Sequence, residues 1–241
     1  MIARWLLVAG LLAISVDQLF AVNEVALPGM GTVDAGDAAP YLSQALEYRR
    51  LGFKEWEIAE LENAIGHARD PKVKAICYAY CGGAYSRVKR YDKAMRNYEE
   101  ALKLAPDSVF FLSWAGDCAF VNGHYPEALA YFERGMKISP HHDELLNSFA
   151  WFRSTCPDRS FRNGIEATRM AKEACERTKW RNVNVIDTLA AAEAEAGYFE
   201  AAASVDAKIL EHKDLTNLGR KEIEERVQQY KNHEAFRRSI R

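Results

Sequence analysis

The sequence predicts an all-α protein built from repeated pairs of helices, and two observations predict this fold class. Glycine and proline are scarce, with 14 and 7 residues among 241, whereas alanine, leucine, glutamate and lysine, which helices tolerate best, are plentiful. Equivalent residues also recur at a fixed interval of 34 positions, as in Gly82 and Gly116, Ala94 and Ala128, and Pro106 and Pro140. Repetition at such an interval indicates stacked supersecondary units.

Composition and charge exclude several classes of protein. Hydrophobic residues make up 49% and charged residues 27% of the chain, which is typical of a folded domain rather than a disordered chain. The formal net charge is -2, whereas nucleic-acid-binding proteins usually carry a concentrated basic face. We therefore expect no nucleic-acid partner.

The N-terminal segment, residues 1–21, is predicted to be a signal peptide. Arg4 precedes an unbroken run of apolar and small residues from Trp5 to Val16, which has the length of a signal-peptide hydrophobic region and is short for a membrane span. We favour export, to the periplasm or out of the cell. An uncleaved membrane anchor and a buried helix that packs on the first repeat remain open alternatives. Residues 22–37, with their glycine, proline and aspartate, are predicted to be a linker.

Each 34-residue unit is predicted to hold two helices. In one unit the helices span 75–89 and 91–104, and in the next they span 109–122 and 126–138. A proline follows each second helix and cannot continue it. From residue 215 to the end, apolar residues recur at helical spacing, which predicts a terminal capping helix.

The two helices of a unit can approach closely only where the residues at their crossing are small. The first helix has small residues at this position, namely Ala45, Gly82, Gly116, Ala150 and Ala190. The second helix has Ala94, Ala128, Ala167 and Ala202. Glu57 is the exception on the second helix. Because each unit leaves apolar surface that only a neighbouring unit can cover, several units must stack.

These residues resemble the tetratricopeptide repeat (TPR), whose signature positions are matched by Gly82, Tyr85, Ala94, Tyr98, Ala101 and Pro106. Gly116, Ala128, Phe132 and Pro140 match the next repeat. Residues 143–210 are similar to a divergent TPR pair of planctomycete-type bacterial proteins, through segments such as Leu146 to Trp151 and Asp187 to Ala192. The resemblance implies an α-α superhelix, a TPR solenoid of about five repeats at 38–74, 75–108, 109–142, 143–182 and 183–210, with a capping helix within 211–241.

The sequence offers no recognisable catalytic or metal site. The five cysteines are Cys77, Cys81, Cys118, Cys156 and Cys175. We expect Cys77 and Cys81 to be buried structural thiols, and Cys156 and Cys175 could pair if the protein is exported. His141-His142-Asp143-Glu144 follows a helix stop and is expected to cap the next helix, since a metal site needs three or four convergent ligands. We therefore expect no cofactor, no metal and no enzymatic activity, with a hydrolase site at the His141-His142 turn as a distant alternative.

The TPR resemblance implies that the first helix of each repeat lines a concave groove. Carrying over the groove positions gives Leu42, Leu46, Ile76, Arg87, Phe110, Asp117, Phe120, Asn147, Trp151 and Asp187 as binding residues, with Arg50 and Ala79 beside them. This lining has no cluster of Lys and Asn, so we do not expect the carboxylate-clamp type of TPR. Packing between repeats is the alternative role for Phe110, Phe120 and Trp151.

Together these features predict a non-enzymatic, exported scaffold that binds a peptide or a partner protein in the TPR groove. The alternative is an accessory subunit of an envelope or secretion assembly that docks through its convex face or its C-terminal helix. Neither interpretation involves a small-molecule substrate, and membrane contact is expected only if the N-terminal segment is uncleaved.

Overall fold

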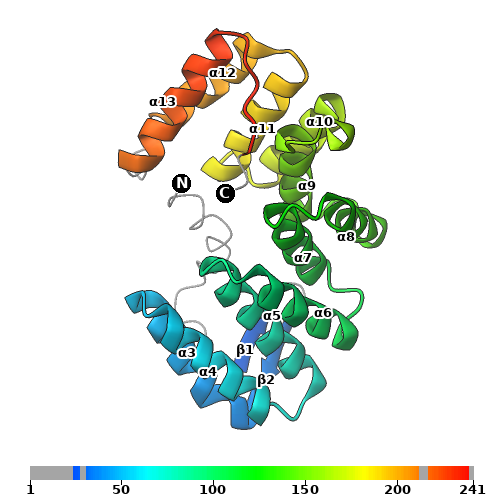
Figure 1. Cartoon of the computed structure of the whole chain (residues 1–241), viewed down its shortest axis with the longest axis vertical. Coiled ribbons are helices and arrows are strands. Elements are labelled where there is room, and N and C mark those ends of the chain that lie inside the picture. The colour runs from blue at the N-terminus through cyan, green and yellow to red at the C-terminus, as the bar shows by residue number, and fades with distance from the viewer. Residues whose placement is uncertain (1–23, 28–30, 212–216, 239–241) are drawn as a thin grey trace. The chain divides into compact units, whose positions relative to one another are not determined.

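The computed structural model describes residues 24–27, 31–211 and 217–238 (Figure 1). The predicted signal peptide lies outside the described residues. The chain divides into two compact units, residues 1–119 and residues 120–241, which we call unit 1 and unit 2.

The described residues from 39 onward form eleven α-helices. They are α3 (Ala39–Leu51), α4 (Lys54–His67), α5 (Pro71–Arg87), α6 (Tyr91–Leu104), α7 (Val109–Val121), α8 (Tyr125–Ile138), α9 (Asp143–Thr155), α10 (Gly164–Arg177), α11 (Val183–Glu195), α12 (Phe199–Ile209) and α13 (Asn217–Lys231). Two 3-10 turns, η2 (Gly36–Ala38) and η3 (Arg159–Phe161), accompany them. The all-α prediction and the succession of helix pairs are confirmed.

A short β-hairpin precedes the helices, inside the segment predicted as a linker. Strands β1 (Glu24–Leu27) and β2 (Gly31–Asp34) pair antiparallel, with Glu24 opposite Asp34 and Leu27 opposite Gly31. In the sequence, two short runs of strand-compatible residues flank Pro28-Gly29, which is a hairpin signal. The glycine and proline content concealed this signal, because it is equally typical of a linker.

The small residues lie at the helix crossings, as predicted. Ala45, Ala150 and Ala190 on first helices and Ala94, Ala128, Ala167 and Ala202 on second helices are all buried. Gly82 shows the constraint directly, because a Cβ atom added there would lie 3.0 Å from Cδ1 of Tyr98 and 3.1 Å from the carbonyl oxygen of Ala94. A side chain at this position would therefore push α5 away from α6.

His142 caps α9, as the sequence predicted. Its Nδ1 accepts a hydrogen bond from the Leu145 N–H at 3.4 Å, which satisfies one of the free donors at the start of the helix. His141 instead lies 2.5 Å from Oε1 of Glu173 on α10. The described residues include no group of three or more His, Cys, Asp and Glu side chains placed to hold a metal ion.

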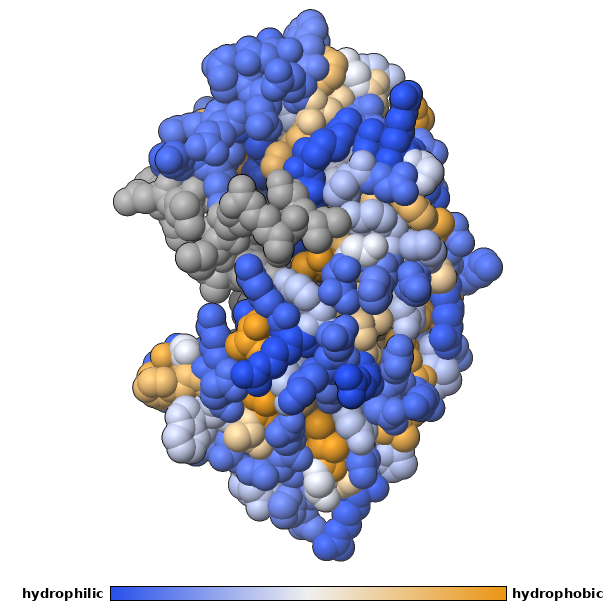
Figure 2. All heavy atoms as spheres, viewed as in Figure 1, coloured by the Kyte–Doolittle hydropathy of each residue, from blue (hydrophilic) through white to orange (hydrophobic). Residues whose placement is uncertain are grey.

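The face drawn in Figure 2 is mostly hydrophilic, and hydrophobic residues show on it in small groups. Among the described residues, no helix combines the length and the apolar character that crossing a membrane requires.

Candidate functional site

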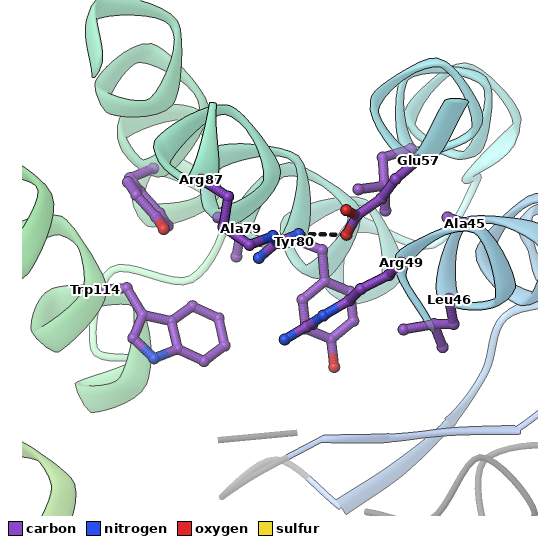
Figure 3. Close-up of a pocket in the computed structure, with 11 residues that line it drawn as sticks. Ala45, Leu46, Arg49, Glu57, Ala79, Tyr80, Arg87 and Trp114 are labelled. Carbon is purple, nitrogen blue, oxygen red and sulfur yellow. Dashed lines mark hydrogen bonds and ion pairs between the residues drawn. The ribbon is translucent and has the colours of Figure 1, made fainter. Parts of the chain in front are cut away.

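A hollow that opens to solvent lies in unit 1 among the first repeats (Figure 3). Its walls come from α3, α4, α5, α6 and α7. The lining residues are Ala45, Leu46, Arg49, Glu57, Leu61, Ala79, Tyr80, Gly83, Arg87, Tyr98 and Trp114. Three of them, Leu46, Tyr80 and Trp114, lie 34 positions apart in the sequence and so occupy the same position of three successive repeats.

One wall of the hollow carries a cluster of charges. Glu57 is buried and forms an ion pair and hydrogen bond with Arg87 (Figure 3). Burial raises the pKa of Glu57, against the opposing effect of Arg87 and Arg49. Burial likewise lowers the pKa of Arg49, and the neighbouring positive charge of Arg87 adds to this effect. Two guanidinium groups and one carboxylate leave this wall with a net positive charge.

The other distinctive feature of the hollow is aromatic. The rings of Tyr80 and Trp114 stack with their centroids 6.3 Å apart and an interplanar angle of 27°. The Tyr80 hydroxyl is buried and has no hydrogen-bond partner among the described residues, and burial raises its pKa to about 12. Phe110 packs edge-on against Trp114 at 6.3 Å. The hollow therefore combines ring surfaces, an unsatisfied hydroxyl donor and positive charge.

The sequence-predicted binding residues of unit 1 divide between this hollow and the core. Leu46 and Arg87 line the hollow, together with Ala79. Leu42 and Ile76 are each 1% exposed and belong to the core. Phe110 and Asp117 are half-buried.

Arg50, also named from the sequence, is exposed and pairs with Glu47 of its own helix. Its neighbour Arg49, rather than Arg50, lines the hollow beside Arg87.

Most of the predicted binding residues of unit 2 are engaged by other parts of the same unit. Phe120 is 1% exposed and packs at 5.1 Å against Phe152. Trp151 is buried and lies against Phe236 at 5.8 Å. Asn147 is half-buried, and its Oδ1 has no hydrogen-bond partner among the described residues.

Asp187 fastens the capping helix rather than lining an open surface. Oδ1 of Asp187 lies 2.5 Å from Nη2 of Arg226, a buried residue of α13. The same guanidinium approaches Oδ2 of Asp206 on α12 at 3.5 Å. Asp187, which was predicted to contact a ligand, thus takes part in an ion-pair cluster within the chain.

The residues of the hollow that sequence reasoning did not name as binding residues include Arg49, Glu57, Tyr80 and Trp114. A sequence signal existed for Tyr80 and Trp114. Tyr80 lies one repeat length after Leu46, which was named as a binding residue, and Trp114 lies two repeat lengths after it. For Glu57 the signal was that it replaces the small residue found at this position of the other second helices. A carboxylate at a helix crossing needs a buried partner.

The five cysteines are buried and free. Burial raises the pKa of Cys156 to about 11 and that of Cys175 to about 12. Cys77 and Cys81 likewise have pKa values raised by burial to about 12, in agreement with structural thiols.

Comparison with known proteins identifies one repeat at the sequence level. A family model described as the tetratricopeptide repeat matches residues 75–108. Over 82 residues the chain is 32% identical to the protein O-mannosyl-transferase TMTC1 of Mus musculus, a match that covers 34% of this chain and 9% of that protein. The chain thus spans less than a tenth of the length of this curated relative.

Solved structures share the fold. A thermophilic TPR protein of Thermus thermophilus has a TM-score of 0.62 at 14% identity, over 81% of this chain and 99% of that one. Yeast Tom70 has a TM-score of 0.61 at 14% identity, over 83% of this chain and 41% of that one. A TPR protein of Parabacteroides merdae has a TM-score of 0.56 at 13% identity, over 82% and 76%. One repeat of the chain thus matches the tetratricopeptide repeat in sequence, and its helical fold is that of solved tetratricopeptide-repeat proteins.

Proposed function

We propose that this protein is a non-enzymatic interaction scaffold that holds a segment of a partner protein in the hollow of unit 1. One observation carries the proposal: Leu46, Tyr80 and Trp114 come from the same position of three successive repeats and line one hollow. A row of side chains at repeat spacing suits an extended chain better than a compact small molecule. The stacked rings and the arginines suit a segment with an apolar residue beside an acidic or polar one.

A binding role is supported over a catalytic one by how the charged groups of the hollow are used. Glu57, the one carboxylate of the lining, is paired with Arg87 and has its pKa raised by burial. The cysteines are buried with raised pKa values and so are poor nucleophiles. The relative named as a transferase is matched over 9% of its length, so its activity does not carry over to this chain.

Photo-crosslinking in the native host tests the proposal. A photo-crosslinking residue replaces Leu46, which lines the hollow, and a control replaces Glu99, which is exposed on α6. We expect one or a few proteins to be crosslinked from position 46 and not from position 99. Identical products from both positions would count against binding in the hollow.

Affinity for the captured partner then locates the binding energy. Trp114→Ala should weaken binding by about thirtyfold, since truncation of a desolvated aromatic at the centre of an interface costs upwards of about 2 kcal/mol. Trp180→Ala is the matched control, because Trp180 is 46% exposed and does not line the hollow. Equal affinities of the two variants would exclude Trp114 from the interface.

Export of the protein remains part of the proposal. It rests on Arg4 and the apolar run from Trp5 to Val16. N-terminal sequencing of the protein from its native host should find the segment removed near residue 21. Intact Met1 in the membrane fraction would indicate the anchored alternative, and intact Met1 in the cytoplasmic fraction would contradict both.

An exposed aromatic group favours the second candidate function, docking onto a larger assembly. Phe53, which precedes α4, and Trp56, in the first turn of α4, are 52% and 61% exposed. Both rings pack against Tyr48, at 6.3 and 5.9 Å. If the protein is an accessory subunit, Phe53→Ser with Trp56→Ser should release it from a large complex in size-exclusion chromatography of a native extract. An unchanged elution position would remove this surface from consideration.

A further inference from the structure

The chain continues beyond the capping helix and turns back over unit 2. His233 adopts a left-handed backbone conformation with φ of 60°, and the Glu234 N–H donates to the carbonyl oxygen of Gln229 at 2.9 Å. Residues 234–238, which we call the C-terminal segment, follow without helix or strand structure. They are placed against residues of α7, α9 and α11 by the contacts described next.

Phe236 makes the apolar contacts of the C-terminal segment. Its ring lies 5.8 Å from the ring of Trp151 on α9. The guanidinium of Arg226 lies 5.6 Å from the Phe236 ring centroid. Phe236 also packs against the buried cluster around Ala190, Ala202 and Tyr230. The Phe236 ring thus contacts the Trp151 ring, the Arg226 guanidinium and the buried apolar cluster.

The two arginines of the segment make the polar contacts. Arg237 forms an ion pair with Oε2 of Glu195 at 2.6 Å, and Glu195 is largely buried at the end of α11. The N–H of Arg238 donates to the carbonyl oxygen of Thr155 at 3.0 Å. Thr155 is the last residue of α9, where helical carbonyls lack donors within the helix. The guanidinium of Arg238 lies 5.2 Å from the Phe120 ring centroid.

These contacts fall on residues that the TPR resemblance assigns to ligand binding. Phe120 and Trp151 are groove positions of adjacent repeats, and both contact the C-terminal segment. The segment therefore occupies this face as a bound peptide would, through a backbone hydrogen bond, a ring and a charge.

We propose that this face of unit 2 is a peptide-binding surface that the C-terminal segment occupies in the free protein. Its external ligand is a segment of a partner protein with an aromatic residue followed by arginine, which displaces the chain's own Phe236 and Arg237. This surface belongs to unit 2 and the hollow belongs to unit 1, so either proposal can fail without the other.

Displacement requires that the segment can leave while the capping helix stays. The segment has no helix or strand structure, and the Arg237 side chain remains 38% exposed. The capping helix is held separately, by the buried ion pairs of Arg226 with Asp187 and Asp206. A tethered segment competes at an effective concentration of about millimolar for a short linker, so an external peptide binds far better once the segment is weakened.

Fluorescence anisotropy with a synthetic peptide tests the proposal. The probe is a labelled peptide with the sequence of residues 232–241, and the proteins are the full wild-type chain and the full chain with Phe236→Ala and Arg237→Ala. We expect the double variant to bind the peptide at least about tenfold more tightly than the wild type does, because its own segment no longer competes. Glu234→Ala is the matched tail variant, since the Glu234 side chain is exposed, and should behave as the wild type.

Two further measurements make the result specific. Adding Glu195→Gln to the double variant should weaken peptide binding about tenfold or more, because the peptide arginine loses its carboxylate. Glu176→Gln, the same change at an exposed position of α10, should leave binding unchanged. A peptide with both Phe236 and Arg237 replaced by alanine should not bind.

Several outcomes would overturn the inference. One is a folded double variant that does not bind the peptide at millimolar concentration, and another is equal affinity of the wild type and the double variant. Binding that is insensitive to Glu195→Gln would place the peptide elsewhere. If the double variant does not fold, the single variants Phe236→Ala and Arg237→Ala must each show the same direction of change, and their failure to do so overturns the inference equally.

Discussion

Glu57 on α4 and Arg87 on α5 form an ion pair at a helix crossing where the other second helices have alanine. The carboxylate is buried, and the Arg87 side chain is 16% exposed at the edge of the hollow (Figure 3). The pair joins the first repeat to the second and also sets the charge of the hollow. Stability and binding are therefore linked at this one position.

We predict that Glu57→Ala lowers the free energy of unfolding by about 1.5–3 kcal/mol, the range for hydrogen bonds to charged groups. The change leaves the guanidinium groups of Arg87 and Arg49 near each other without the carboxylate. Glu57→Gln should cost less, because the amide still accepts a hydrogen bond from Arg87. Urea unfolding of each variant gives the comparison.

A double-mutant cycle checks that the loss belongs to the ion pair. Glu57→Ala with Arg87→Ala should be less destabilising than the sum of the single changes. Glu99→Ala, an exposed glutamate on α6, serves as the control and should lie within about 0.5 kcal/mol of the wild type. Strict additivity of the two losses would mean that Glu57 and Arg87 do not stabilise each other.

We predict that Gly164→Ala destabilises the protein by about 1–3 kcal/mol, the usual cost of overpacking. A Cβ atom at Gly164 would lie 2.4 Å from the backbone nitrogen of Ala196 and 2.6 Å from the carbonyl carbon of Glu195. Backbone cannot move aside as a side chain can, so α10 and α11 must separate. The melting temperature measures the effect.

Gly66→Ala is the matched control for that substitution. Gly66 lies in α4, and an added Cβ would meet nothing within 4 Å. Alanine should therefore stabilise this helix by about 0.5–1 kcal/mol, the intrinsic difference between alanine and glycine. A shared loss of stability in both variants would refute the packing argument for Gly164.

We predict that Arg226→Ala costs about 3–5 kcal/mol, because it removes the guanidinium that pairs with the buried carboxylates of Asp187 and Asp206. The capping helix α13 should lose its protection in amide hydrogen exchange before the rest of unit 2 does. Lys221→Ala changes an exposed residue of the same helix and should leave both quantities unchanged. Uniform loss of protection across unit 2 would argue against a separate fastening of α13.

The sequence predicts the repeats well because their positions are set by local periodicity. The helix at 91–104 agrees with α6 at both ends, since a 34-residue interval and a following proline define it. The hollow was predicted less well. Arg50 was chosen in place of Arg49, which lines the hollow, because a groove position carried over from a family can be out by one residue, and on a helix one residue turns the side chain by about 100°.

The contacts of the C-terminal segment could not be predicted from the sequence at all. Phe236 meets Trp151 only because a left-handed residue that follows α13, His233, turns the chain back. Neither helical periodicity nor the TPR pattern extends over such a turn. Such contacts join residues that are distant in the sequence, and they depend on the path of a segment that is not helical. They therefore leave no periodic pattern in the sequence.

We predict that the native protein reacts slowly with a thiol reagent at pH 8 and that all five cysteines react after unfolding in guanidinium. The cysteines are buried and free, and burial raises the pKa of Cys118 to about 11 and that of Cys77 to about 12. The reactive thiolate is therefore rare at pH 8, and the reagent is excluded as well. A count of three reactive thiols in the unfolded, unreduced protein would instead indicate a disulfide, and Cys156 and Cys175 are the pair that the sequence leaves possible in an exported protein.

The last prediction separates the two roles that the sequence left open for Phe110 and Phe120. Phe120 is 1% exposed and packs against Phe152 and Tyr125, so Phe120→Ala should cost about 3–5 kcal/mol as a core truncation. Phe110 is half-buried and rests on Trp114 at the edge of the hollow. Phe110→Ala should cost clearly less stability and should weaken binding of the partner captured at the hollow. Urea unfolding and affinity are measured on both variants, and a larger loss of stability for Phe110 than for Phe120 would contradict this assignment of core and site.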